Sequence, residues 1–184
     1  MANSVLSTER LYAEPFSKSD LPLLRDLHAD PRVNQFLNPA CARWDDAMLN
    51  DKLLHILRDQ DRFGFSKWKL YTHDGQFVGR AGFSKFSPTS EIEIGFCLKV
   101  DHWGKGYASE IALGLKEWFF RETYFTHLIG YARADHPASR KIYDKLGMQY
   151  RETRVVGSWA CDLFQVLSPV FCAQEEKDTA AVSA

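Results

Sequence analysis

Residues 91–122 contain the pattern that most restricts the fold of this 184-residue chain. In EIEIGFCLKV (91–100) apolar residues occupy every second position. One face of the predicted strand therefore carries Ile92, Ile94, Phe96 and Leu98, and the other carries Glu91, Glu93, Gly95 and Cys97. The glycine-rich stretch DHWGKG follows, and YASEIALGLKEWFFRE (107–122) then repeats apolar residues at helical spacing. This order predicts a strand that passes through a tight turn directly into a helix.

The turn itself has the composition of an anion-binding loop. Gly104 and Gly106 can adopt positive φ, so successive N–H groups can converge at the start of the following helix. The helix dipole and Lys105 add positive charge there, which favours a phosphate or pyrophosphate. Taken alone, the turn is equally compatible with a simple reversal of the chain. It is not a Walker A loop, and Ser109 stands where a dinucleotide fingerprint has its third glycine.

Periodicity elsewhere predicts an α+β fold with a mixed, mostly antiparallel sheet. Asp74-Gly75 divides two alternating segments, which indicates a hairpin with a type I′ turn. Pro31 is expected to end the first helix. Strands are expected within 8–16, on both sides of the turn in 64–86, within 127–134, and in a closing hairpin of 148–156 and 160–170. Helices are expected within 19–31, 44–60 and 136–146.

Length and composition predict one domain, residues 1–172, with a polar and mobile tail at 173–184. A net charge of -1 without a long Lys/Arg run argues against nucleic acid as a partner. No apolar run approaches the ~20 residues of a membrane-spanning helix, and no signal-peptide pattern begins the chain. We therefore expect a cytoplasmic protein, either monomer or homodimer.

Cysteine and histidine spacing gives no indication of a metal centre. The four cysteines are isolated from one another, without CxxC pairs, and no histidines form an HxxxH spacing. We therefore expect reduced thiols and no bound metal. The cysteines are Cys41, Cys97, Cys161 and Cys172.

A second motif, HPASRKIYDKLGM (136–148), places polar side chains at helical offsets of three and four: His136, Ser139, Arg140 and Tyr143. On its own it could be an exposed polar helix face. Together with the turn, it makes residues 6–168 resemble the GNAT acyltransferase superfamily, in particular its RimJ/RimL-type branch of protein N-terminal acetyltransferases.

Specific residues carry this resemblance. WGKGYA matches the family pattern [Arg/Gln]-x-x-Gly-x-[Gly/Ala] at Gly106 and Ala108, with Trp103 at the Arg/Gln position. In the second motif His136 replaces the family's asparagine and Met148 its phenylalanine. The hairpin and strand signatures of the branch also match, at Trp68, Asp74-Gly75, Gly79 and Glu93-Ile94-Gly95-Phe96.

The resemblance implies the GNAT fold, with six to seven strands, helices on both faces of the sheet, and strands four and five splayed apart. It also implies acetyl-CoA as co-substrate, with its pyrophosphate on the turn and its pantetheine lying along the fourth strand like an added strand. The implied cofactor-binding residues are Phe96, Cys97, Leu98, Trp103, Gly104, Lys105, Gly106, Tyr107, Ala108, His136, Ser139 and Tyr143.

Acetyl transfer to an amine requires a base and a group that stabilises the leaving thiolate. Glu93 is the candidate base, with the charge of Glu91 one pleat away raising its pKa. Tyr143 is implied as the donor to the thiolate, and Ser139, one turn earlier, is its competitor. An acetyl-cysteine intermediate on Cys97 is not expected, because no activating partner lies beside it in the sequence.

The resemblance implies an N-acetyltransferase that acts by direct attack in a ternary complex, with a protein N-terminal α-amine as the favoured acceptor. The alternatives are a small amine such as a polyamine, amino acid or aminoglycoside, or a coenzyme A-binding sensor without turnover. Nicotinamide binding is a further, weaker alternative. Acceptor contacts are expected within 19–60 and around 156–161, and the possible contributors are Arg32, Asn34, Trp44 and Trp159.

Overall fold

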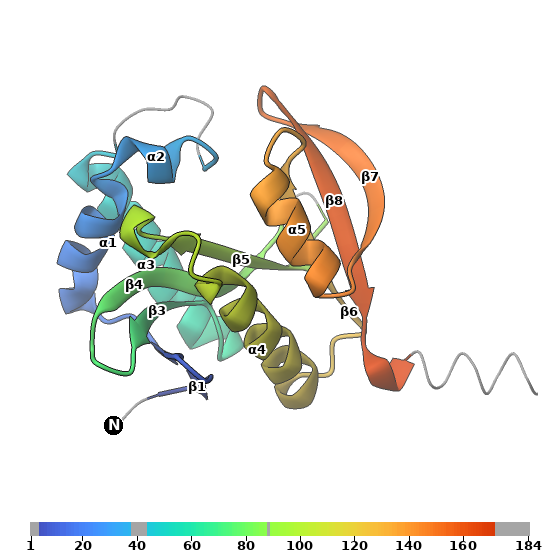
Figure 1. Ribbon diagram of the computed structural model, residues 1–184, viewed down its shortest axis with the longest axis horizontal. Coiled ribbons are helices and arrows are strands. Elements are labelled where there is room, and N and C mark those ends of the chain that lie inside the picture. The colour runs from blue at the N-terminus through green and yellow to red at the C-terminus, as the bar shows by residue number, and fades with distance from the viewer. Residues whose placement is uncertain (1–3, 38–43, 88, 172–184) are drawn as a thin grey trace, which may run out of the picture.

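The computed structural model describes residues 4–37, 44–87 and 89–171. Its centre is one mixed sheet of eight strands in the order β1-β2-β3-β4-β5-β6-β8-β7 (Figure 1). The strands are β1 Leu6–Ser7, β2 Leu11–Glu14, β3 Lys67–Thr72, β4 Phe77–Lys85, β5 Ile92–Leu98, β6 His127–Arg133, β7 Gln149–Val156 and β8 Trp159–Leu167. The helices are α1 Leu21–His28, α2 Pro31–Asn34, α3 Asp46–Phe63, α4 Tyr107–Glu122 and α5 Pro137–Lys145, with 3-10 turns η1 Lys18–Asp20 and η2 Val100–His102.

The two faces of β5 pack against different helices, as its alternation predicts. Ile94 and Leu98 belong to the main core together with Ile111 and Leu115 of α4. On the opposite face, Cys97 packs in a smaller cluster with residues of α1 and α2. Helices therefore cover both faces of the sheet, and the fold has the expected mixed α+β architecture.

Strands β5 and β6 separate after a short contact. They are parallel and pair only at Glu93 with Ile129 and at Ile94 with Gly130. From Phe96 onward β5 keeps its antiparallel partner β4 on one side, while β6 continues with β8. The sheet therefore opens between β5 and β6, which confirms the predicted splay between the fourth and fifth of the expected strands.

Some local predictions were wrong. Gly75 has a φ of 86°, but Asp74 does not have positive φ, so the β3–β4 turn is not type I′. Instead, Gly75 N donates to Thr72 O and Thr72 N donates to Gln76 O, which makes a longer loop closed by one left-handed glycine. Pro31 begins α2 rather than ending a helix, because its fixed φ suits the first helical position. The sheet also has one strand more than expected, since Leu6 and Ser7 pair with β2.

Other predictions hold. The helix expected at 107–122 is α4, with the same bounds. Gly147 ends α5 with a φ of 73°, as expected for a glycine that follows a helix. Cys97 and Cys161 carry free thiols, and the tail at 173–184 lies outside the described residues. Within the described ranges, no helix is long and apolar enough to cross a membrane.

Candidate functional site

The turn before α4 presents a row of unused backbone donors. Gly104 and Gly106 have φ values of 74° and 82°, and Gly106 is the N-cap of α4. In the described part of the chain, the N–H groups of residues 104–109 donate to no backbone or side-chain acceptor. Six successive donors at a helix N-terminus form a site for an anion the size of a pyrophosphate.

Residues distant in sequence hold this turn in place. Arg10 donates from Nη1 to the Lys105 carbonyl at 3.0 Å and forms an ion pair with Glu110 at 2.7 Å. Thr8 donates to Glu110 Oε1 at 2.6 Å. These contacts neutralise the one carboxylate in the first turn of α4, so the positive end of the helix dipole remains available to an anion. No sequence pattern points to Arg10 in this role, because only the fold brings the residue before β2 to the turn.

The opened edge of β5 leads from this turn toward the middle of the sheet. Lys99 N donates to Val78 O of β4, and backbone groups alternate in direction along a strand. The N–H and C=O groups of Phe96 and Leu98 therefore face the gap, while those of Cys97 face β4. The Leu98 carbonyl already accepts a hydrogen bond from Trp103 Nε1 at 2.8 Å. Trp103 thus fastens the turn to β5 from the position where the family has Arg or Gln.

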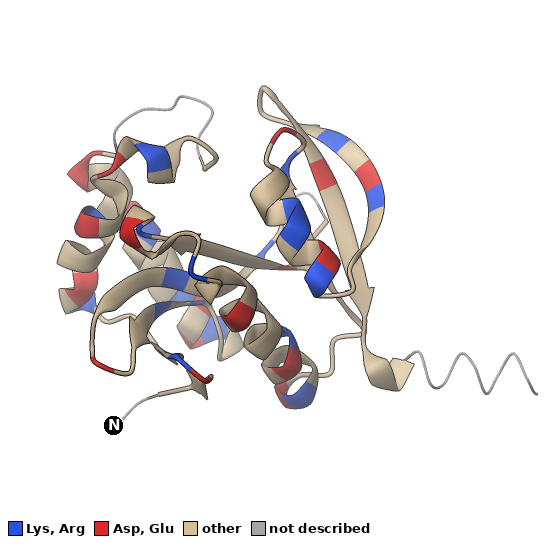
Figure 2. Cartoon of the chain, viewed as in Figure 1, with Lys and Arg blue, Asp and Glu red and all other residues tan. Residues whose placement is uncertain are grey.

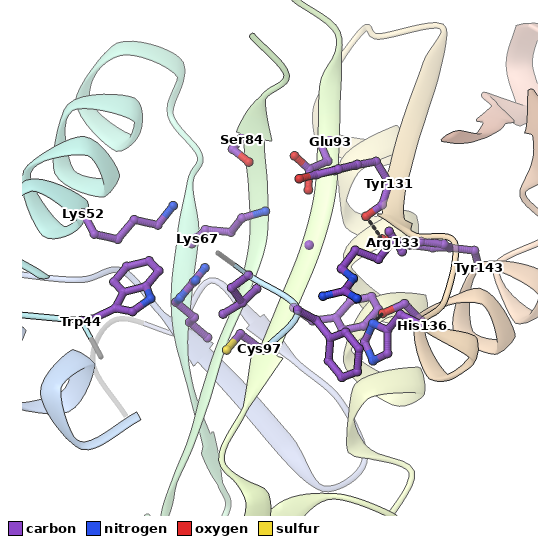
Figure 3. A pocket seen from close by; sticks show the side chains of 17 residues that line it. Trp44, Lys52, Lys67, Ser84, Glu93, Cys97, Tyr131, Arg133, His136 and Tyr143 are labelled. Carbon is purple, nitrogen blue, oxygen red and sulfur yellow. Dashed lines mark hydrogen bonds between the residues drawn. The ribbon is translucent and has the colours of Figure 1, made fainter. Parts of the chain in front are cut away.

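A cavity of about 290 Å³ lies where β5 and β6 separate (Figure 3). Six of the sequence-predicted site residues line it: Glu93, Phe96, Cys97, His136, Ser139 and Tyr143. The remaining lining residues are Phe36, Leu37, Trp44, Lys52, Lys67, Arg80, Ser84, Gly95, Tyr131, Ala132 and Arg133. The structure therefore brings together the catalytic candidates of both motifs, whereas Trp103 to Ala108 lie outside this cavity.

Glu93 faces the buried lysine Lys67 across Gly95. A Cβ at Gly95 would lie 2.8 Å from Lys67 Nζ and 3.3 Å from Glu93 Oε1, so a side chain at this position would displace the end of Lys67. Burial raises the pKa of Glu93, although the cationic side chains around it oppose the shift. A carboxylate with a raised pKa is a better proton acceptor near neutral pH.

The expected cause of that shift was wrong. Glu91 does not lie against Glu93: its carboxylate accepts hydrogen bonds from Arg151 Nη1 at 2.6 Å and from His127 Nε2 at 2.9 Å. These two partners and the Thr89 hydroxyl outweigh burial and lower the pKa of Glu91. Burial of Glu93 itself, and not repulsion from Glu91, is what raises its pKa.

Tyr143 is buried in the wall of the cavity. Its hydroxyl donates to the carbonyl of Tyr131 at 3.0 Å, and its ring packs on Gly130, where a Cβ would lie 2.6 Å from the ring. Burial, with the nearby charge of Glu93, raises the pKa of Tyr143 well above its ordinary range. Tyr143 is therefore a hydrogen-bond donor rather than a proton source, because its phenolate is strongly disfavoured here.

Ser139 forms the second polar group on α5. Its Oγ lies 2.9 Å from His136 Nδ1, and the imidazole stacks on Phe36 with ring centroids 3.8 Å apart. Burial lowers the pKa of His136, which favours the neutral ring, so the tautomer of the ring decides which of the two groups donates in this hydrogen bond. The residue that replaces the family's asparagine thus orients the Ser139 hydroxyl.

Of the four residues expected to contact the acceptor, the structure places one at the cavity. Trp44 lines the cavity, where it stacks on His28 at 4.2 Å between ring centroids. Asn34 is buried and hydrogen-bonded to His28, and Arg32 pairs with Asp30 at 2.6 Å, so neither faces the cavity. Trp159 also lies outside the lining, and Arg133 packs over its ring. Burial raises the pKa of Cys97, which argues further against an acetyl-cysteine.

Sequence reasoning missed three basic residues of the cavity, Lys52, Lys67 and Arg80. The alternation of apolar and polar residues could have indicated the strand faces. Lys67 and Arg80 lie on the same sheet face as Glu93, which becomes clear only when the register of β3, β4 and β5 is known. The described residues contain no group of three or more metal-ligating side chains.

Comparison with known proteins identifies the family to which the chain is similar. A family model for the acetyltransferase (GNAT) domain matches residues 10–149. The uncharacterized protein YkkB of Bacillus subtilis is 29% identical over 99 residues, which make up 52% of this chain and 58% of YkkB. The uncharacterized N-acetyltransferase p20 of Bacillus licheniformis is 26% identical over 151 residues, covering 78% of this chain and 82% of p20.

Solved structures share the fold. An acetyltransferase from Agrobacterium tumefaciens superposes with a TM-score of 0.76 at 24% identity, over 88% of this chain and 92% of its own. An acetyltransferase of Salmonella typhimurium that modifies the N-terminal serine of ribosomal protein L7/L12 gives 0.73 at 14% identity, over 87% and 96%. Spermidine N-acetyltransferase of Vibrio cholerae, in complex with CoA and spermine, gives 0.70 at 11% identity, over 88% and 98%.

The family model matches most of the chain, and the solved structures share its fold. The structure has a glycine turn with unused N–H groups, an opened sheet and a cavity that contains a carboxylate. The chain belongs to the GNAT acetyltransferase family, and it is an acyltransferase.

Proposed function

We propose that this protein transfers an acetyl group from acetyl-CoA to a primary amine, by direct attack within a ternary complex, and that the favoured acceptor is a protein N-terminal α-amine. The observation that carries the proposal is the continuity of the site. Six unused N–H groups at the start of α4 lead, along the open edge of β5, to the cavity that contains Glu93. The acetyltransferase that modifies ribosomal protein L7/L12 supports the choice of acceptor.

The donor half follows from the backbone. The N–H groups of residues 104–109 bind the pyrophosphate of coenzyme A, and Lys105 adds a full positive charge. The N–H and C=O groups of Phe96 bind the pantetheine in the gap between β5 and β6, as an added strand would. The thioester then reaches the cavity beside Tyr143 and Ser139. The complex of the Vibrio cholerae enzyme with CoA supports this choice of co-substrate.

The acceptor half requires an uncharged amine. An α-amine with a pKa near ~7.7–8.0 is about 10–15% neutral at pH 7, whereas a lysine-like amine is under ~0.1% neutral. Glu93 removes the amine proton, directly or through a water, as the nitrogen attacks the thioester carbonyl carbon. The carbon–sulfur bond then breaks and the thiolate leaves. Ser139 stabilises this thiolate by donating a hydrogen bond, or Tyr143 does so once its hydroxyl turns away from the Tyr131 carbonyl.

A two-part screen tests the proposed function. Acetyl-CoA should raise the melting temperature, whereas NAD(P) should not. Thiol release should follow when Ser-, Ala- or Met-starting peptides are added, with spermidine and amino acids as the small-amine alternatives. Stabilisation by acetyl-CoA without thiol release from any amine would indicate a sensor. Absence of stabilisation by acetyl-CoA would refute the proposal.

Glu93→Gln tests the base, and Glu91→Gln is its matched control one pleat away. Glu93→Gln should lower kcat/KM by about 10²-fold or more, the usual contribution of a positioned base, and leave acetyl-CoA affinity unchanged. Glu91 is held by Arg151 and His127 and does not line the cavity, so Glu91→Gln should retain turnover. Equal rates for the two variants would exclude Glu93 as the base.

A further inference from the structure

The cavity that receives the acceptor amine is lined by more basic side chains than carboxylates. Lys52 from α3, Lys67 from β3 and Arg80 from β4 all line it, and we call these three side chains the basic cluster. Figure 2 shows Lys and Arg positions on the central strands, whereas the outer helices carry both basic and acidic positions. Among the described residues that line the cavity, Glu93 is the only carboxylate.

The basic cluster lacks carboxylate partners. Within the described ranges, none of its three side chains forms an ion pair with an Asp or Glu. Arg80 is 5% exposed, and its buried Nε has no hydrogen-bond acceptor among the residues described. Lys67 is equally buried, and its Nζ donates to the Gly82 carbonyl at 2.9 Å. A buried guanidinium donor without an acceptor is costly, so the site favours a ligand that supplies one.

A second carboxylate, Asp59 of α3, favours the charged forms of Lys52 and Lys67 from outside the cavity. It does not line the cavity, so it does not occupy the space that a ligand would take. Arg133, at the far wall, already pairs with Asp135. Figure 3 shows Lys67 between Lys52 and Glu93, with its ammonium end directed toward β5. The anion-deficient side of the cavity is therefore the side of α3, β3 and β4.

We infer that the acceptor carries an anionic group, a carboxylate or a phosphate, within a few bonds of its amine, and that the basic cluster binds this group while Glu93 takes the amine proton. This inference rests on the proposed function and narrows its acceptor class. The cavity of about 290 Å³ has room for a small acceptor or for the first residues of a peptide. Polyamines and aminoglycosides would add positive charge to a site in which basic side chains already outnumber carboxylates.

The state of the lysines is consistent with this inference. Burial lowers the pKa of Lys52 to about 8, and the charge of Arg80 adds to the effect. Burial also lowers the pKa of Lys67 to about 7, against the opposing charge of Glu93. An anion bound beside the two lysines would favour their protonated forms. Binding of an anionic acceptor would therefore be accompanied by proton uptake at these lysines.

Matched acceptor pairs test the inference. The peptide arm compares a Ser-Asp-starting peptide with its Ser-Asn counterpart. The small-molecule arm compares diglycine with its C-terminal amide, and spermidine is the cationic control. The acidic member should have the higher kcat/KM by about tenfold or more in at least one arm, which also identifies the source of the anion. Spermidine should be the poorest acceptor.

The ratio of kcat/KM for acidic and neutral members is then measured in each variant, so that losses common to both cancel. Lys52→Gln and Arg80→Gln should reduce the ratio to below about threefold, because each removes one donor to the anion. Lys52 is only half-buried, so its variant is expected to fold even where Arg80→Gln is not. Lys18→Gln, on exposed η1, should keep the wild-type ratio.

Equal use of acidic and neutral acceptors, or an unchanged ratio in Lys52→Gln, would overturn the inference and leave the proposed function standing. Failure of the proposed function would be recognised separately, because acetyl-CoA would then neither stabilise the protein nor release thiol with any amine. Calorimetric binding of the two serine peptides repeats the comparison without turnover, and equal affinities there would also overturn it.

Discussion

Replacing Lys67 with methionine tests whether burial holds this ammonium group away from its ordinary charge state. Lys67 is 5% exposed, and burial lowers its pKa from 10.5 to about 7, with Arg80 and Lys52 acting in the same direction and Glu93 against it. Between pH 7 and 10.5 the unfolded chain therefore binds more protons at this residue than the folded one, so stability rises with pH across that window. Integration from pH 7 to 9 gives about 2 kcal/mol.

The assay is urea unfolding of wild type, Lys67→Met and the exposed control Lys18→Met at pH 7 and pH 9. The stability of wild type relative to Lys67→Met should increase by about 2 kcal/mol between these values. Loss of the Lys67 charge also raises the pKa of Glu93 further, which lowers the stability of the variant as pH rises and so acts with the same sign. The difference between wild type and Lys18→Met should stay constant.

A pH-independent difference between wild type and Lys67→Met would refute this reasoning. A cavity or packing effect of the substitution would be the same at both pH values, because no proton is bound or released in it. Such a result would mean that water or an unrecognised partner solvates the ammonium group, and the electrostatic account of the basic cluster would lose its main support.

Three further substitutions separate the parts of the site. Gly106→Ala should cost about 1 kcal/mol through its φ of 82° and weaken acetyl-CoA binding in calorimetry, whereas Gly64→Ala, with a φ of 76° at the end of α3, should cost the same and leave that affinity unchanged. Gly95→Ala places a Cβ 2.8 Å from Lys67 Nζ. Because the flexible end of the lysine can move, the free energy of unfolding should fall by only about 1 kcal/mol. Turnover should nevertheless fall at least about tenfold. Tyr143→Phe should lower kcat by about tenfold or more and keep acetyl-CoA affinity; an unchanged rate would transfer the thiolate-stabilising role to the neighbouring serine hydroxyl.

Local patterns explain which parts of the fold could be predicted. The bounds of α4 follow from the repeat of its apolar residues, and the hairpin of β3 and β4 follows from alternation around Asp74-Gly75. The type of that turn could not be predicted, because its loop length depends on how the two strands pair. Likewise, Leu6–Ser7 forms a strand only because β2 provides an edge for it.

The candidate site divides in the same way. Glu93, Ser139 and Tyr143 were identified by motif, and they line one cavity. Their surroundings depend on contacts from elsewhere in the chain: the Tyr143 hydroxyl donates to a carbonyl of β6, and Phe36 stacks on the His136 ring that is hydrogen-bonded to Ser139. Such partners are chosen by packing, which a motif does not describe.

The sequence by itself determined the turn before α4, because glycine φ values and the N-terminus of a helix are properties of a few adjacent residues. Only the tertiary structure decided the character of the cavity between β5 and β6. Lys52, Lys67 and Arg80 come from three elements, and they meet because the register of the sheet aligns Lys67 with Gly82 and Arg80 with Cys97. Burial, which sets their charge and that of Glu93, is a property of the whole fold and not of any segment.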